Sequence, residues 1–376
     1  MLRLLQTSDL HLGARNVDLG EAGATLRERR FAAFERSLDL ARSERVNVVL
    51  IVGDLFDTNL VTRTIVGRVA TALAGLATAG IRTVILPGDH DRLEPASIWH
   101  ALDLAALVAG QASAQADGRA DAPGLVSMLD PGLGAAGDLI VADLGLTITA
   151  RFPAPDLRDD RWRVGLVHRH VRPRDDEIAG AGVDYLAVGG PHEAASGGAA
   201  DVAWGASGAP EIVTTRDRAG EVLLVRLDEH GDRRSVTVER RRVGTTRYEA
   251  LELDLTGLPD QAALEAAIAA RGDGGAGADL VLDVHLVGAW SDSLEADPEL
   301  LQAALRGRFL QLRIQNEALP VLTGAAAPPA ETVRGAFIRD LEARIASPLE
   351  GDPPPDELRA ALRLGRRLLA PTDRPG

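Results

Sequence analysis

Apolar runs typical of buried strands alternate with helical periodicity through the first part of the chain. Residues 46–54 (VNVVLIVGD) are apolar up to a final Gly-Asp, a pattern typical of a strand buried on both faces. Residues 2–9 and 82–91 have the same character, and the stretches between them place apolar residues on one helical face. The first face carries Phe31, Phe34, Leu38 and Ala41, and the second carries Val66, Val69, Leu73 and Leu76. This βαβαβ order predicts an α/β protein in which β-sheets are flanked by helices.

A Gly/Ala-rich stretch from about Gly110 to Gly137 interrupts the alternation and predicts an insertion or a loop. Strand-like runs then resume, and the run 220–243 predicts a β-hairpin that turns at Gly231 and Asp232. The other strand-like runs are 138–150, 162–171 and 184–192. We expect the first domain to cover residues 1–243.

The pattern changes from Tyr248 onward and predicts a small α+β domain over residues 245–318. Its expected strands lie within 250–258, 279–288 and 309–315, and its expected helices are 261–270 and 298–305. A Pro/Ala-rich linker follows, and two short amphipathic helices are predicted within 330–376. Their apolar stripes are Val333, Phe337, Leu341 and Ile345 in the first helix, and Leu358, Leu362 and Leu369 in the second. Such stripes favour docking to a partner protein, and packing onto the chain's own domains is the alternative.

Composition narrows the chemistry. The chain has 376 residues, which predicts two or three domains. It has no cysteine, so disulfides, thiolate metal sites and cysteine nucleophiles are excluded, and any metal must be held by His, Asp, Glu or Asn. The net charge of -14 argues against a general basic surface for nucleic acid and leaves room for local arginine patches. Neither a signal peptide nor an apolar run of about 18 residues is found, so a cytoplasmic location without membrane contact is expected.

Acidic residues and histidines gather at the ends of the expected strands, where open α/β sheets bind their ligands. Five of the eight histidines take part. The residues are Asp9 and His11; Asp54 and Asp57; Asp89, His90 and Asp91; His168 and His170; and His192. Asp and His ligands without thiolate suit Mn, Fe or Zn, and two such ions bridged by a carboxylate form a centre that hydrolyses phosphate esters. The remaining histidines, His100, His230 and His285, are interpreted as structural or surface residues.

The ordered series DLH, GDLFD, GDHD, H and GGPH resembles the motifs of the calcineurin-like metallophosphoesterases. Within that superfamily, TSDLHLG and VGDLFDT are most similar to the SbcD-type nuclease subunit of the SbcCD double-strand-break repair complex. The resemblance implies a layered metallophosphoesterase fold, with 245–318 as a capping domain and 330–376 as a helical segment that docks a partner. It further implies a DNA exonuclease or endonuclease with two divalent metal ions, manganese being expected, an SbcC-like ATPase partner and a possible homodimer.

The resemblance also implies residue roles. Asp9, His11 and His192 would hold the first metal, Asp54 would bridge both metals, and Asp89 and His168 would hold the second. His90 would protonate the leaving oxygen, Asp91 would orient the His90 ring, and Asp57 would brace its loop. The sequence departs from the family pattern at two positions, because Asp89 stands where the family has Asn and Gly190 stands where it has His. The second site is therefore expected to be weak, with His170 as a candidate replacement ligand. A histidine restored at position 190 is expected to strengthen it if the backbone follows the family's path, although Pro191 biases residue 190 toward extended conformations that would misaim the ring.

Two other functions stay open. One is a degenerate phosphoesterase fold that binds DNA or the ATPase without cutting, which the missing histidine at Gly190 favours. The other is a phosphodiesterase acting on nucleotides or small molecules, which the predicted capping domain disfavours. For DNA contact, the candidates are Arg15, Asn16 and Arg92, which follow the metal motifs directly, and exposed solubilising residues are the alternative interpretation.

Overall fold

The computed structural model describes most of the chain, in two compact units, 1–248 and 249–376. The described residues are 1–16, 22–115, 125–130, 132, 137–155, 160–213, 220–231, 233–290, 294, 296–320, 332–348, 352–354, 357–358, 361–362 and 365. Each unit is considered by itself. None of the helices in these described ranges is long and apolar enough to cross a membrane.

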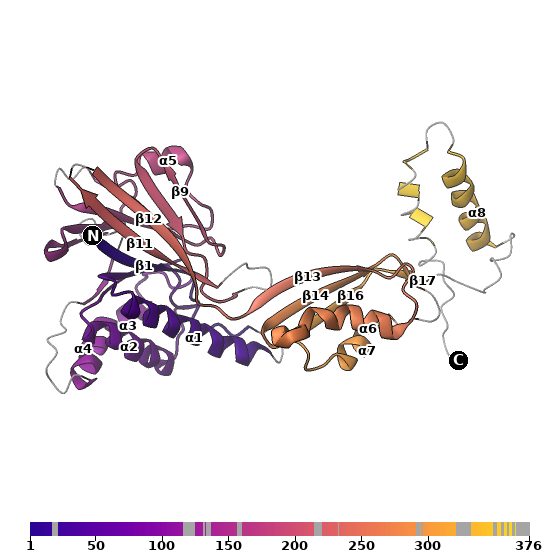
Figure 1. Ribbon diagram of the computed structural model, residues 1–376, viewed down its shortest axis with the longest axis horizontal. Helices are drawn as coiled ribbons and strands as arrows, with labels where there is room; N and C mark the ends of the chain where they lie inside the picture. The colour runs from indigo at the N-terminus through magenta and orange to yellow at the C-terminus, as the bar shows by residue number, and fades with distance from the viewer. Residues whose placement is uncertain are drawn as a thin grey trace. The chain divides into compact units, whose positions relative to one another are not determined.

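The first unit contains two six-stranded sheets within its described residues. One sheet has the order β12-β11-β1-β2-β3-β4, in which β1 to β4 run parallel and β11 pairs antiparallel with β1 and β12. Its strands are β1 (Leu2–Thr7), β2 (Val48–Val52), β3 (Arg82–Leu86), β4 (Val126–Met128), β11 (Glu221–His230) and β12 (Arg233–Arg242). Figure 1 shows β11 and β12 as a long hairpin, as the sequence predicts; its turn includes Gly231, whereas Asp232 lies outside the described residues.

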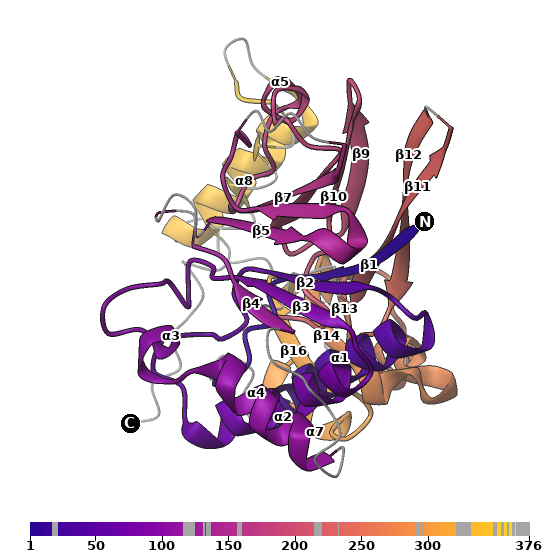
Figure 2. The same ribbon diagram turned by 90° about the vertical axis from the view of Figure 1, so that its left-hand side faces the viewer.

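The second sheet has the order β5-β6-β7-β8-β10-β9. Its strands are β5 (Asp138–Val141), β6 (Leu146–Thr149), β7 (Trp162–His168), β8 (Tyr185–Gly189), β9 (Ala195–Ala199) and β10 (Val202–Ala206). The helices of this unit are α1 (Ala22–Ser43), α2 (Arg63–Thr78), α3 (Ile98–Ala101), α4 (Leu104–Gln115) and α5 (Asp175–Ala179). Figure 2 shows the two sheets as stacked layers, with α1, α2 and α4 on the outer face of the first. The predicted α/β fold with flanked sheets is confirmed.

The alternation of side chains along β2 explains this layering. Leu50 points into the core between the two sheets, whereas Val49 and Ile51 point into the core beneath the helices. All five residues of β2 are buried, so the strand is apolar on both faces, as its sequence predicts. Each fully buried Val, Leu or Ile contributes roughly 1.5–3 kcal/mol through burial of apolar surface. The helix faces predicted at Phe34 and Leu73 pack into the second of these cores.

Gln6 on β1 links the two sheets by polar contacts inside the core. Its Nε2 donates to the carbonyl oxygens of Val188 (3.1 Å) and Gly205 (2.9 Å), and the hydroxyl of Tyr185 donates to its Oε1. Gln6 and Tyr185 are fully buried. The side-chain amide of Gln6 is therefore satisfied by partners on the opposite sheet, which fixes the position of one sheet against the other.

The expected loop between Gly110 and Gly137 is partly wrong. Helix α4 continues to Gln115, because Val108 and Ala112 are buried against the helical core at helical spacing. Strand β4 pairs with β3 and completes the parallel edge of the first sheet. Alanine is a strong helix former, so the Ala-rich composition of this stretch is compatible with a helix. Residues 116–124 lie outside the described residues.

The second unit contains the strands and helices that the sequence predicts between 248 and 316. A sheet of order β13-β14-β16 carries α6 and α7 on one face (Figure 1). The elements are β13 (Arg247–Asp254), α6 (Gln261–Ala269), β14 (Leu280–Val287), β15 (Ala289–Trp290), α7 (Pro298–Ala304), β16 (Gln311–Asn316), β17 (Leu319–Pro320) and α8 (Val333–Ala346). Asp260 and Asp297 cap α6 and α7 by accepting backbone N–H groups of their first turns. The role of this unit as a cap stays a prediction.

Helix α8 forms where the first C-terminal helix is predicted. Its buried residues are Gly335, Ile338 and Leu341, so of the predicted stripe Leu341 is buried, whereas Val333 is 77 % exposed. Docking of a partner by this stripe stays a prediction. Most of the second predicted helix lies outside the described residues.

Candidate metal centre

The loops that follow β1 and β2 lie side by side and present the first acidic residues. The N–H of Asp9 donates to the carbonyl of Gly53 (3.1 Å), and the N–H of His11 donates to that of Asp54 (3.0 Å). Asp9, His11 and Asp54 all have a positive φ, between 43° and 53°, which is uncommon for residues with a Cβ. Strained backbone of this kind persists when surrounding contacts hold it, and it is concentrated at functional sites.

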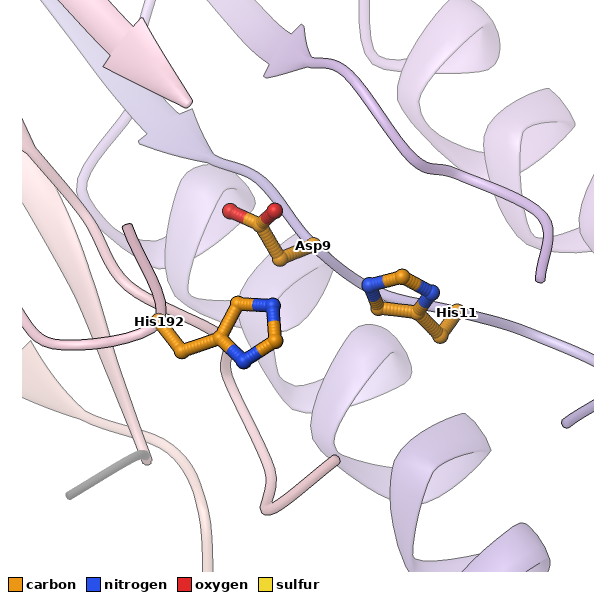
Figure 3. Close-up of side chains that lie close together, drawn as sticks. All are labelled: Asp9, His11 and His192. Carbon is orange, nitrogen blue, oxygen red and sulfur yellow. The ribbon is translucent and has the colours of Figure 1, made fainter. Parts of the chain in front are cut away.

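Three groups of candidate ligands form within the part of the chain that the structure describes. They are Asp9, His11 and His192; Asp9, Asp54 and His168; and His11, Asp57 and His90, with ligand atoms within 4.8 Å of one another in each group. Figure 3 shows the side chains of Asp9 and His11 on one loop and that of His192 on another, lying close together. The structure thus brings Asp9, His11, Asp54, His168 and His192 into one region.

Some buried polar atoms of this region make no hydrogen bond of good geometry to the described residues. They include Oδ1 of Asp9 and the ring nitrogens of His11, whose contacts with the carboxylates of Asp57 and Asp54 are 3.3 and 3.7 Å long. A buried polar group left without a partner costs roughly 1–3 kcal/mol. A divalent cation bound among these atoms would remove that cost, and oxygen and imidazole ligands suit Mn, Fe or Zn. The residues present therefore fit a bound metal.

Asp54 lies between two histidines. Its Oδ2 is 3.2 Å from Nε2 of His168 and 3.7 Å from Nε2 of His11, and its Oδ1 accepts the N–H of His90 (2.8 Å). Burial alone would raise the pKa of Asp54, but the hydrogen bond and charge of His168 outweigh it and lower the pKa to about 2. Burial would lower the pKa of His168, but its contact with Asp54 raises it to about 9. Metal binding at His168 therefore competes with a tightly held proton, so the metal affinity should rise with pH.

Gly53 allows His168 to approach the β2 loop closely. The ring Nδ1 of His168 lies 3.0 Å from the carbonyl of Val52, which can only accept, so Nδ1 carries the proton and Nε2 faces Asp54. A Cβ on Gly53 would lie 1.8 Å from Nδ1 of His168, and its φ is +88°. The glycine before Asp54 is thus required by the packing of a histidine from the other sheet.

Asp57 has a partner that the sequence analysis missed. Its Oδ1 lies 3.3 Å from Nδ1 of His11, and the contact with His11 lowers the pKa of Asp57. The signal in the sequence was the second Asp of GDLFD, which was interpreted only as a brace for its loop. Nδ1 of His90 lies 3.1 Å from the carbonyl of Asp57, and the rings of His11 and His90 are 4.6 Å apart. His90 therefore lies beside a candidate metal ligand, where a proton donor is expected.

Asp91 does not face the ring of His90 as expected. Its Oδ2 accepts the N–H of Phe56 (3.0 Å) and its Oδ1 accepts the N–H of Gly88 (2.7 Å). The carboxyl is fully buried, and burial raises its pKa to about 6. Both oxygens are thus used by backbone groups, because the loops after β2 and β3 need an acceptor where they meet. Asp91 fixes these loops, and through them the position of His90.

Replacing Asp91 by alanine should destabilise the protein by roughly 2–6 kcal/mol, since two buried N–H donors would lose their acceptor at roughly 1–3 kcal/mol each. Urea unfolding of the full chain measures this change. Asp39→Ala is the control, because that exposed carboxyl pairs only with Arg42 on the surface of α1 and should matter little. Stability of Asp91→Ala within about 0.5 kcal/mol of the unchanged protein would show that both donors find other partners.

Asp89 and His170 lie next to each other outside the three ligand groups of the described residues. Oδ2 of Asp89 is 3.3 Å from Nε2 of His170, and Oδ1 of Asp89 is 3.2 Å from the guanidinium of Arg92. His170 is 72 % exposed. Their roles as ligands of the second metal stay predictions.

Gly190 leaves no room for the histidine that the family pattern has at this position. Its φ is +102°, and a Cβ would lie 2.2 Å from the carbonyl oxygen of Arg169. Its N–H donates to Oδ2 of Asp9 (3.0 Å). The expectation that Gly190→His strengthens the second site is therefore wrong, because the backbone has taken a path that excludes a side chain.

The three residues suggested for DNA contact differ in exposure. Arg15 and Arg92 are exposed, whereas Asn16 is only 8 % exposed and has a φ of +50°. Asn16 is therefore a poor candidate for a phosphate contact. Arg92 is held by Asp89 and stays a candidate, as does Arg15.

Comparisons with known proteins were made with this geometry in view. Residues 2–180 match the family model described as calcineurin-like phosphoesterase. A curated relative, the DNA double-strand break repair protein Mre11 of Saccharolobus solfataricus, is 33 % identical over 110 residues, which cover 28 % of this chain and 28 % of that protein. The protein of the same name from Aeropyrum pernix is 35 % identical over 91 residues, covering 24 % of this chain and 21 % of its own length. The match thus spans about a quarter of the length of these relatives.

Two solved structures of lower similarity also match. A Vps29 double mutant from Entamoeba histolytica has 12 % identity and a TM-score of 0.30, and the match covers 64 % of this chain and 99 % of that chain. Vacuolar Protein Sorting 29 from Cryptosporidium parvum has 11 % identity and a TM-score of 0.27, with 64 % of this chain and 98 % of that chain covered.

Proposed function

Because residues 2–180 form a calcineurin-like metallophosphoesterase domain, we propose that this chain is a metal-dependent phosphodiesterase that cuts DNA at double-strand breaks. The names of the two relatives, both DNA double-strand break repair proteins, support DNA as the substrate. The proposal includes membership of an SbcCD-like complex, with an SbcC-like ATPase as partner, and a location in the cytoplasm. It also includes self-association as a homodimer and partner docking by residues 330–376.

The observation that carries this proposal is the convergence of carboxylates and imidazoles from both sheets on one region. Asp9, His11 and His192 would hold one divalent ion, and Asp54 and His168 would face a second. Divalent ions bound there supply an activated water and neutralise the oxygens of a phosphodiester. Manganese is the proposed metal, because carboxylates and imidazoles are its usual protein ligands.

The chain's own residues would move the protons. His90 is exposed at the edge of the centre, and its Nδ1 is held by the carbonyl of Asp57. Its Nε2 is thereby left as the atom that gives a proton to the leaving oxygen. Asp57 holds His11 through Nδ1, which keeps Nε2 of His11 directed at Asp54.

The proposal is tested by manganese-dependent cleavage of linear DNA beside hydrolysis of bis(4-nitrophenyl) phosphate, a chromogenic phosphodiester. Cleavage of both, abolished by a chelator, is expected. Hydrolysis of the chromogenic ester alone would instead indicate a phosphodiesterase for small molecules or nucleotides. Failure to cleave either would contradict the proposal and favour the second candidate function.

That second candidate is a phosphoesterase fold that binds DNA or its ATPase partner without cutting. The conformation of Gly190 favours it, because an expected ligand of the second metal is missing and no side chain fits in its place. The neighbouring Asp89 lies outside the ligand groups of the described residues. An electrophoretic shift of DNA without cleavage, in the presence of manganese, would support this function.

His90→Ala should lower the cleavage rate by at least ~100-fold, the usual effect of losing a positioned proton donor. Manganese binding, measured by calorimetry, should change little, because the side chain of His90 lies at the edge of the centre. His100→Ala is the matched control, since His100 contacts Ser97 on α3 and should leave the rate unchanged. A rate close to that of the unchanged protein would remove His90 from the mechanism.

A further inference from the structure

A cavity of about 660 Å³ opens beside the candidate metal centre. This volume lies within the range of small-molecule sites, roughly 300–1,000 Å³. The loops after β3, β6 and β7 form its walls, and its border includes two residues of the metal region, Asp89 and His168. Its other polar or aromatic lining residues are Arg92, Asp130, Arg151, Phe152 and Arg169. None of these five figures in the metal chemistry proposed above.

One wall of the cavity is formed by the guanidinium of Arg169, which lies over the ring of Phe152. The guanidinium carbon of Arg169 lies 5.0 Å from the centre of the Phe152 ring, and Arg169 is also 3.6 Å from Glu177. Phe152 is half-buried against the core behind the second sheet, which holds its ring in place. Aromatic rings and arginine planes of this kind are the surfaces on which proteins stack unpaired bases.

The arginines of the cavity are already neutralised by carboxylates. Arg151 makes a double contact with Asp138, and Arg92 is 3.2 Å from Asp89. A paired guanidinium attracts a further phosphate weakly, but it keeps N–H donors that its ion pair does not use. Together with the carboxyl of Asp130, these groups offer both donors and acceptors, which is what the edge of a base requires. The lining therefore suits a base better than a second phosphate.

We propose that this cavity binds one unstacked base of the DNA strand whose phosphate lies at the metal centre. The base would stack on the guanidinium of Arg169, which the ring of Phe152 supports from behind, with its edge towards Arg151 and Asp130. A base inside a duplex reaches such a surface only after unpairing, which costs a few kcal/mol. The chain therefore cuts single-stranded or frayed DNA in preference to intact duplex. This inference rests on the proposed function.

The test uses the full chain with manganese and four substrates: a short single strand, a blunt duplex, a single strand with an abasic residue beside the cut, and bis(4-nitrophenyl) phosphate. The single strand should be cut at least ~10-fold faster than the duplex. Phe152→Ala and Arg169→Gln should each lose at least ~10-fold more activity on the intact single strand than on the chromogenic ester, which has no base. On the abasic strand the unchanged protein and these variants should cut at similar rates, because the contact is already missing.

Arg172→Gln is the matched control, because Arg172 also stacks on an aromatic ring, Trp204 at 4.8 Å, and pairs with Asp175, but does not line the cavity. It should cut the intact single strand at the unchanged rate. Equal losses on the single strand and the ester would overturn the inference, as would undiminished single-strand cleavage by Phe152→Ala. If the unchanged protein hydrolyses neither DNA nor the ester, the proposed function itself fails. Phe152→Tyr, which keeps the stacking ring, should restore most of the single-strand activity and excludes a folding defect as the cause.

Discussion

Replacing Asp54 by asparagine is expected to lower metal-dependent cleavage by at least ~1,000-fold, the loss that follows when several kcal/mol of transition-state stabilisation disappear. The Asp54 carboxylate is the one that faces both His11 and His168, at 3.7 and 3.2 Å. Its pKa of about 2 means that it is charged throughout the working range of pH. Asparagine is almost the same size, but it has no charge and its amide nitrogen cannot bind a cation. The variant should therefore fold and fail to hold metal.

Calorimetric titration with manganese and cleavage of the chromogenic ester measure this prediction. The unchanged protein should show two unequal binding steps, and Asp54→Asn should lose both or weaken them strongly. Asp143→Asn is the control, because that exposed carboxyl pairs only with Arg82, away from the centre. Activity within about tenfold of the unchanged protein would show that Asp54 is not at the reaction centre.

Gly53→Ala should be strongly damaging although it adds only one methyl group. Its Cβ would lie 1.8 Å from Nδ1 and 2.3 Å from Cγ of His168, both in a ring fixed by packing. The φ of +88° adds backbone strain for any residue with a side chain. Overpacking and strain each cost roughly 1–3 kcal/mol, so a loss of roughly 2–6 kcal/mol is expected together with loss of metal binding.

The matched control is Gly67→Ala in the middle of α2. A Cβ at Gly67 would meet nothing within 4 Å, and alanine favours the helix by about 0.5–1 kcal/mol. The free energy of unfolding measured in urea should therefore fall for Gly53→Ala and rise for Gly67→Ala. Equal stability of Gly53→Ala and the unchanged protein would mean that His168 does not occupy the position described here.

The strands and helices of the first domain could be predicted because their surroundings impose a simple pattern. Strand β2 is buried on both faces and α2 on one face, so apolar residues recur without interruption in one and at helical spacing in the other. Helix α4 was missed because its Ala-rich sequence resembles a loose linker, although Val108 and Ala112 pack into the core.

The sequence could predict only those parts of the site whose position follows from where the strands end. Parallel strands bring Asp9 and Asp54 to the same edge of their sheet, so their proximity follows from the order of the strands alone. The partners of Asp91 could not be predicted, because they are backbone groups of two loops. Gly190 has no room for a side chain because the carbonyl oxygen of Arg169 lies close to it. The sequence around Gly190 does not reveal the position of that carbonyl.

The polar bridge of Gln6 has a consequence for how activity responds to distant substitutions. Asp9, His11 and Asp54 follow strands of one sheet, whereas His168 ends a strand of the other sheet and His192 follows another strand of that sheet. The candidate metal centre thus takes its ligands from both sheets. If one sheet slid over the other, the ligands from the two sheets would move apart. Gln6 on β1 donates hydrogen bonds to carbonyl groups of β8 and β10 in the opposite sheet. These bonds oppose sliding of one sheet over the other. The geometry of the metal centre therefore depends on the contacts that hold the two sheets together as well as on the ligands themselves.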